Sequence, residues 1–417
     1  MKFKKMLFGF LAVSLLLVGC GGKKEAPADA QEKKEEVAKV EESKTNYHIG
    51  IVTPTVSQSE DSLRGAESVM KEYGSVKDGG KIIHITNPDN FMQEQETTIS
   101  QIVSLADDPE MRAIIVGEGI PGTYSAFKAI REKRPEILLM VSNPHEDPDL
   151  MSSAADLIVN PDSVARGYLI IKAAKDLGAD KFMHISFPRH LSYELIARRR
   201  AIMKETAKDL GMEYIEMSAP DPVSDVGVPG AQQFILEQVP NWIEKYGKNV
   251  AFFATNDAQT EPLLKQIAAH GGYFIEADLP SPTMGYPGAL GIKFDDSEKG
   301  NWPKILDKVE KSVLKAGGKD RMGTWAYSYN FATVEALVDV AMKNIENQTP
   351  VDDFKNLLAS YQKFTPGAGW NGKRYTDADG VEKDNFFLLY QDTYVFGKGY
   401  LHMNEVEIPE KYFKIKK

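Results

Sequence analysis

Residues 117–122 read Gly-Glu-Gly-Ile-Pro-Gly, the G-x-G-x-x-G spacing of dinucleotide-binding loops. In such loops the glycines let the backbone approach a pyrophosphate, which rests on the N-terminus of the next helix. The loop normally follows the first strand, and an acidic residue comes about 20 positions later. Here it follows the third apolar run, and the next run ends at Val141-Ser142-Asn143 without a carboxylate. The motif therefore predicts a loop at a strand end, where either Glu118 accepts hydrogen bonds from ligand hydroxyls or the glycines only shape a turn.

Polar side chains also follow other apolar runs, and these candidate ligand contacts are Thr53, Thr55, Ser57, Asn143, Arg189, His190 and Tyr193. The hydroxyls after the first run suit a neutral polar ligand, although Ser57 or Ser59 could instead cap the next helix. Asn143 can both donate and accept hydrogen bonds, as the edges of sugars and bases require. Arg189 could clamp a carboxylate or phosphate with two parallel hydrogen bonds.

Signatures of the common enzyme classes are absent from the sequence, which has no G-x-S-x-G, H-E-x-x-H or G-x-x-x-x-G-K-[ST] motif. The 7 histidines lack metal-ligand spacing, and residues 377–380 begin like a calcium loop without its remaining ligands. Acidic residues outnumber basic ones by 60 to 50, which argues against a nucleic-acid partner. We predict no catalytic residue, no metal and no cofactor.

Short apolar runs alternate with amphipathic segments of helical length from Tyr47 onward. This alternation is typical of parallel sheets that are covered on both faces. The expected strands span residues 48–52, 82–86, 113–117, 137–141, 157–159, 182–186, 214–217, 250–255 and 289–294. The carboxyl ends of parallel strands share one edge of a sheet, so that edge must position the polar side chains. Beyond residue 350 the alternation gives way to a segment rich in glycine and aromatic residues.

The N-terminus has the pattern of a secretory signal, because lysines within the first five residues precede an apolar stretch at residues 6–18. That stretch is shorter than the about 20 residues that span a bilayer. The run Leu-Val-Gly-Cys that ends at Cys20 resembles the bacterial lipoprotein signal, which implies cleavage before Cys20 and lipid on that residue. A plain secretory signal with an incidental cysteine is the alternative. Cys20 is the only cysteine in the chain, so it forms no internal disulfide.

Residues 21–46 are rich in Lys, Glu and Ala and contain no aromatic side chain. Such a segment buries too little apolar surface to fold alone. We predict a signal peptide at residues 1–19 and a disordered, lipid-anchored tether at residues 20–46.

Three stretches, taken in order, resemble the type I periplasmic binding proteins, the solute receptors of ABC importers. They are HIGIVTPTVSQSEDSLRGAESVMKEYG, ADLIVNPDSVARGYLIIKAAKDLGADKFMHIS and KNVAFFATNDAQTEPLLKQIAAHGG. The likeness covers about residues 47–346 and is nearest to the branch of sugar, nucleoside and autoinducer receptors. It implies an α/β fold of two doubly wound, Rossmann-like lobes, joined by three crossovers, that close on a ligand.

The resemblance sets the expected boundaries. The N-terminal lobe takes residues 47–160 plus about 322–347, the C-terminal lobe takes 161–321, and 348–417 form an elaboration packed on the lobes. In that family an Asn-Asp pair follows a late strand, and its Asp often binds ligand hydroxyls. The resemblance therefore points to Asn256 and Asp257. The alternative is that one of them caps the next helix. Trp325 and Tyr327, near the expected return to the first lobe, could stack on a ligand or pack in the core.

The resemblance also implies a function. The expected protein is an extracytoplasmic lipoprotein that captures a small polar ligand and delivers it to an ABC permease. The expected ligand is sugar- or nucleoside-like, and an amino-acid-like ligand is the second choice because of Arg189. A sensor that signals to a membrane receptor, or an extracytoplasmic enzyme, is the alternative. Monomer is the default state of the family.

Overall fold

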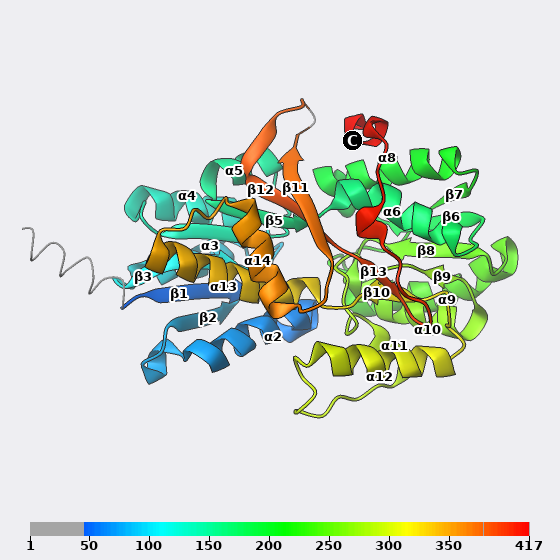
Figure 1. The fold of residues 1–417 in the computed structure, drawn as a ribbon, viewed down its shortest axis with the longest axis horizontal. Helices are drawn as coiled ribbons and strands as arrows, with labels where there is room; N and C mark the ends of the chain where they lie inside the picture. Colours follow the sequence, from blue (N-terminus) through cyan, green and yellow to red (C-terminus); the bar gives the residue numbers. More distant parts are fainter. Residues whose placement is uncertain (1–45, 378, 417) are drawn as a thin grey trace, which may run out of the picture. The chain divides into compact units, whose positions relative to one another are not determined.

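Two mainly parallel sheets, each flanked by helices, organise the residues that the computed structural model describes, 46–377 and 379–416 (Figure 1). Both sheets belong to one compact unit, Asn46–Lys417. The apolar runs form their buried centres: Ile49, Ile114 and Phe253 are each 0% exposed. The predicted α/β fold with two doubly wound lobes is thereby confirmed. Among the described residues, no helix has both the length and the apolar character needed to cross a membrane.

The first lobe contains a seven-stranded sheet in the order β11-β12-β5-β4-β3-β1-β2, in which only β11 is antiparallel to its neighbour. The strands are β1 (His48–Thr53), β2 (Ile82–Thr86), β3 (Met111–Val116), β4 (Leu138–Ser142), β5 (Leu157–Pro161), β11 (Trp370–Thr376) and β12 (Glu382–Gln391). The helices are α2 (Val56–Tyr73), α3 (Gln95–Ser104), α4 (Thr123–Lys133), α5 (Pro148–Ala154), α13 (Tyr329–Asn347) and α14 (Phe354–Phe364). The strand order reverses between β1 and β3, which puts crossover helices on both faces.

The second lobe contains a four-stranded parallel sheet in the order β7-β6-β8-β9. Its strands are β6 (Lys181–Ser186), β7 (Glu213–Ser218), β8 (Val250–Ala254) and β9 (Tyr273–Phe274). Its helices are α6 (Ser163–Asp176), α7 (Pro188–Ser192), α8 (Glu194–Asp209), α9 (Gly227–Tyr246), α10 (Thr260–His270), α11 (Tyr286–Leu290) and α12 (Trp302–Lys315). A three-stranded sheet joins β10 (Gly323–Trp325), β13 (Thr393–Val395) and β14 (Gly399–Tyr400).

The prediction of a strand at residues 289–294 was wrong. The short helix α11 ends at Leu290, and Gly291 then turns the chain with a positive φ of 67°. Pro287 lies in the first turn of α11, where its fixed φ favours the start of a helix. The apolar character of this run therefore reflects packing and not strand formation.

Three crossovers join the lobes, after β5, between β10 and α13, and between β12 and β13. Residues 348–417, expected as an elaboration packed on the lobes, supply strands to the sheets of both. In the first lobe β12 pairs with β5 in parallel, with Phe386 opposite Ile158, and lies inside the sheet. The strand forms because the run from Phe386 to Tyr390 is apolar and buried, although glycines and polar residues surround it.

Glu276, which follows β9, connects residues next to all three crossovers. Its side chain is fully buried. One carboxylate oxygen accepts from Arg166 Nε at 2.6 Å, just after the first crossover. The other accepts from Trp325 Nε1 at 2.9 Å and from Thr393 Oγ1 at 3.2 Å, at the second and third. Arg166 also donates to the carbonyls of Ala277 and Asp278. One buried carboxylate thus fixes the three connecting segments relative to each other.

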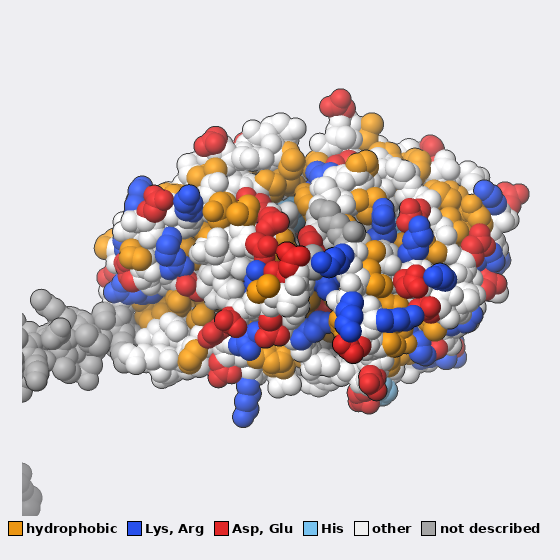
Figure 2. Space-filling model, turned by 90° about the horizontal axis from the view of Figure 1, so that it is seen from above, with side chains coloured by type: hydrophobic (Ala, Val, Ile, Leu, Met, Phe, Trp, Pro, Cys, Tyr) orange, Lys and Arg blue, Asp and Glu red, His pale blue; other side chains and the backbone are white. Residues whose placement is uncertain are grey.

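The face of the described chain seen in Figure 2 carries acidic and basic side chains interspersed, with hydrophobic side chains only in small groups. Large exposed apolar surfaces mark permanent partner sites on soluble proteins, and this face presents none. One face does not test the oligomeric state, and the monomer stays a prediction.

Candidate ligand-binding cleft

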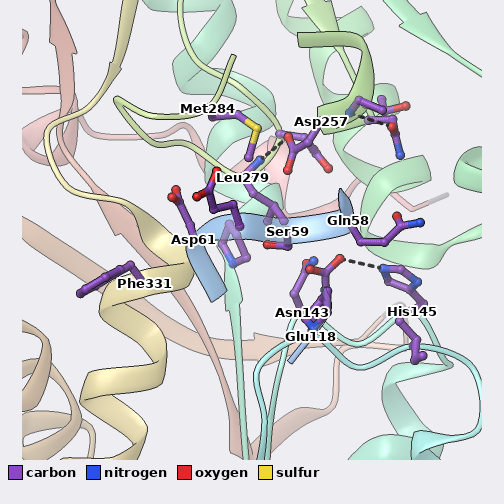
Figure 3. A pocket seen from close by; sticks show the side chains of 18 of the residues that line it. Gln58, Ser59, Asp61, Glu118, Asn143, His145, Asp257, Leu279, Met284 and Phe331 are labelled. Atoms are coloured by element: carbon purple, nitrogen blue, oxygen red, sulfur yellow. Dashed lines mark hydrogen bonds and ion pairs between the residues drawn. The ribbon is translucent and has the colours of Figure 1, made fainter. Parts of the chain in front are cut away.

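A cavity of about 890 Å³ opens at the carboxyl ends of the strands of both lobes (Figure 3). In open α/β sheets, ligands bind where the strand order reverses, because the loops there diverge. The reversal between β1 and β3 supplies the cavity residues Thr55 and Glu118, and the reversal between β6 and β8 supplies Arg189 and Asp257. A cavity of this size suits a small molecule.

Most of the candidate contacts come together here, and those that line the cavity are Thr55, Glu118, Asn143, Arg189, His190, Tyr193, Asn256 and Asp257. They come from five segments of the two lobes, and each segment follows the end of a strand, namely β1, β3, β4, β6 or β8. The rule that polar residues after parallel strands share one edge pointed to most of them, and the family resemblance pointed to Asn256 and Asp257.

Other candidates lie elsewhere. Thr53 is fully buried and donates its hydroxyl to Pro54 O at 2.9 Å. Trp325 is fully buried beside Glu276, and Tyr327 donates its hydroxyl to Pro366 O at 2.6 Å. None of these three lines the cavity, because each side chain satisfies its polar atom inside the core. The side chain of Ser57, Cys20, the signal peptide and the tether up to residue 45 lie outside the described part of the chain.

The glycine-rich loop shapes the first lobe's side of the cavity. A Cβ on Gly119 would come within 2.7 Å of Val141, so a larger residue would push two neighbouring loops apart. Glu146 accepts hydrogen bonds from Gly122 N and Tyr124 N and so covers the N-terminus of α4. A phosphate would need those same N–H groups, so this geometry does not suit a dinucleotide.

Glu118 projects from this loop into the cavity (Figure 3). One of its oxygens lies 3.7 Å from Nε2 of His145, and Oε2 is buried with no hydrogen-bond partner among the described residues. Burial, together with the negative charge of Asp278, raises the pKa of Glu118 to about 7. Burial lowers the pKa of His145 to about 3, so that histidine is neutral at pH 7 and does not neutralise the carboxylate.

Asn256 and Asp257 take different roles. Asn256 caps a short helical turn, since Oδ1 accepts from Ala258 N at 3.0 Å. Asp257 lines the cavity from the second lobe and accepts one hydrogen bond, from Leu279 N at 3.3 Å. Burial and the nearby charges of Asp278, Glu118 and Asp61 raise its pKa well above the usual value.

Arg189 is already paired within the protein. Its guanidinium holds Asp221 bidentately at 2.7 and 2.9 Å and donates a third hydrogen bond to Tyr193 Oη at 2.9 Å. A ligand carboxylate would have to compete with that pair. The guanidinium therefore shapes the wall of the cavity, and the case for an amino-acid-like ligand weakens.

Sequence reasoning missed several cavity residues, above all Asp61, Asn87, His145 and Asp278. Asp61 is buried and accepts hydrogen bonds from Ser328 of the first lobe and Thr283 of the second. Asn87 directly follows β2, so the strand-end signal that found the others applied to it as well. His145 stacks on Tyr193 across the cleft, with ring centroids 5.2 Å apart. The lobes therefore touch on both sides of the cavity.

A family model described as "Protein of unknown function (DUF3798)" matches residues 47–323. Two uncharacterised proteins of Treponema pallidum (strain Nichols) are 42% and 36% identical to this chain. Each alignment covers 51% of this chain, and 93% and 96% of those proteins, respectively.

Among solved structures, one from Clostridium difficile 630, named as a "Putative transcriptional regulator", superposes with a TM-score of 0.68 at 24% identity. It covers 84% of this chain and 99% of that chain, and so it shares the fold. An ABC transporter periplasmic solute binding protein from Actinobacillus succinogenes 130z, with bound D-allose, reaches 0.49 at 13% identity, over 73% of this chain and 93% of that one. With the match over residues 47–323 and the two-lobed architecture, the chain belongs to the DUF3798 family and has the fold of the type I periplasmic binding proteins.

Proposed function

We propose that this protein is an extracytoplasmic solute receptor that captures a small polar molecule between its lobes and presents it to an ABC permease. The observation that carries the proposal is the cavity of about 890 Å³, whose walls bring polar side chains from the strand ends of both lobes. A solute that touches both walls stabilises the closed arrangement, and a partner can read that population shift. The hydrogen-bonding groups suit sugar- or nucleoside-like solutes.

The proposal includes no covalent chemistry. Two histidines line the cavity; burial lowers the pKa of His145 to about 3, and Nδ1 of His190 lies 2.6 Å from Thr255 O. Burial lowers the pKa of His190 to about 4, far from the value that suits a base at neutral pH. A sensor role differs from transport only in the membrane partner, and the cavity serves either role equally.

Thermal unfolding of the purified protein against a panel of sugars, nucleosides, amino acids, amines and short peptides tests solute binding. A solute at 100 times its Kd adds roughly 2.7 kcal/mol of stability. For a protein of this size we expect the midpoint to rise by about 2–4 °C for one chemical class. No rise with any solute, and no small molecule released from denatured protein in mass spectrometry, would contradict the proposal.

The proposed membrane anchor is the lipid on Cys20. Replacing Cys20 with serine removes the thiol that would carry it, so we expect the protein to move from the membrane fraction to the soluble extracytoplasmic fraction. Fractionation of cells followed by immunoblotting measures this. Equal membrane retention of the wild-type and Cys20→Ser proteins would refute the lipid anchor without affecting solute binding.

A further inference from the structure

The arginines that line the described cavity are all engaged by protein carboxylates. Arg64 pairs with Glu60 and Glu67, Arg166 with Glu276, Arg189 with Asp221 and Arg199 with Asp278. The lining lysines, Lys71 and Lys299, are exposed to solvent. The buried part of the cavity therefore offers an incoming solute no unpaired cation.

Among the carboxyl groups that line the cavity, Glu118 and Asp257 have no arginine or lysine partner in the described chain. Glu118 and Asp257 approach the cavity from different lobes (Figure 3). The charged groups that act on them are Asp278 and Asp61 and each other, all of them acidic. Oε2 of Glu118 has no hydrogen-bond partner among the described residues. Acidic groups collected in a site with little water repel one another and are poorly solvated, an arrangement that proteins retain mainly at functional sites.

An independent observation comes from Asn87. Its side chain lines the same cavity and is only 3% exposed. Nevertheless, neither Nδ2 nor Oδ1 has a hydrogen-bond partner in the described chain. A buried amide without partners is unfavourable, and a solute would supply both a donor and an acceptor. Asn87 therefore points to a bound polar molecule by an argument that does not depend on charge.

We propose that the solute carries a cationic amine, which sits between the carboxylates of Glu118 and Asp257, while Asn87 binds a second polar group. This inference rests on the proposed solute-binding function and specifies its chemistry. An ammonium group donates up to three hydrogen bonds, enough to reach carboxylates on both lobes at once. The apolar side chains of Leu279, Met284 and Phe331 line the same cavity and would contact the body of the solute. The cation thereby replaces the repulsion across the cleft with attraction and favours closure.

The test compares amines with uncharged counterparts of similar shape. Isothermal titration calorimetry at pH 8 uses putrescine against 1,4-butanediol and ethanolamine against ethylene glycol, each with wild-type protein. The same titrations use the isosteric variants Glu118→Gln and Asp257→Asn. Glu335→Gln is the matched control, because burial also raises the pKa of Glu335 to about 7 but its side chain lies on α13 and does not line the cavity.

We expect at least one amine to bind the wild type with a Kd at least about tenfold lower than that of its uncharged counterpart. Glu118→Gln and Asp257→Asn should each raise the Kd of that amine by at least about tenfold. Glu335→Gln should bind the amine with the wild-type Kd. An uncharged or acidic solute that binds equally well to wild type, Glu118→Gln and Asp257→Asn would overturn this inference and leave the receptor function standing. Binding of no amine by the wild type would also overturn it. Only the absence of binding by every solute class, with nothing released on denaturation, would remove the receptor function as well.

Discussion

Replacing Glu276 with glutamine is expected to lower the free energy of unfolding by about 3–5 kcal/mol, because it breaks a buried ion pair by removing one partner. Arg166 and Glu276 are both 0% exposed. The two oxygens of Glu276 accept from Arg166 on one side and from Trp325 and Thr393 on the other. The amide nitrogen of glutamine is a donor and would face a donor in either orientation. Arg166 would also keep its charge without a compensating carboxylate.

Chemical denaturation monitored by circular dichroism measures this loss. Thr393→Val is the matched control, since it removes one hydroxyl hydrogen bond to the same carboxylate while it keeps the shape of the side chain, and it is expected to lower the free energy of unfolding by only about 1 kcal/mol. If Glu276→Gln proves as stable as Thr393→Val, the carboxylate does not hold the crossovers together as the contacts indicate.

Replacing Glu118 with glutamine is expected to stabilise the solute-free protein at pH 8 and to lose that advantage on acidification. The folded-state pKa of Glu118, about 7, lies above its usual value of 4.5. The folded state therefore binds the proton more tightly, and wild-type stability falls as pH rises between these two values. The difference corresponds to at most about 3 kcal/mol above pH 7. Glutamine has no such dependence, because it does not titrate.

The groups that face Glu118 support this sign. His145 is neutral throughout this range, since burial lowers its pKa to about 3, and the charge of Asp278 opposes ionisation of Glu118. Thermal unfolding of both proteins at pH values from 4 to 8 measures the difference, with the exposed Glu132→Gln as control. A constant difference between wild type and Glu118→Gln across this range would show that Glu118 titrates normally.

Much of the fold could be predicted from the sequence, because its strands are apolar and its helices amphipathic at the spacing that parallel sheets require. The order of these elements then located the cavity, since the ends of parallel strands meet at one edge. Glu118 was found in this way, whereas Asp257, 139 residues later, was singled out by the family resemblance of its Asn-Asp pair. The strand predicted at residues 289–294 was wrong because its apolar side chains are only partly buried against the core and the exposed Gly291 turns the chain.

The pairing of charges could not be predicted. Arg189 has the residue type and position of a ligand clamp, yet its partner Asp221 lies 32 residues away on a loop whose path no local pattern reveals. Trp325 has an aromatic face that could stack on a sugar, but its indole N–H is taken by Glu276. The cleft is acidic because the arginines that line it are paired with carboxylates of the protein, whereas Glu118 and Asp257 have no such cationic partner in the described chain.

The measurement that tests the central claim most directly is amide hydrogen exchange with and without the solute that gives the largest thermal shift. If the solute binds between the lobes, exchange must slow at the strand ends of both, after β1 and β3 in the first lobe and after β6 and β8 in the second. Protection that appears on both sides at the same solute concentration is the predicted result. Protection confined to one lobe, or found only away from these loops, would contradict an interlobe binding site.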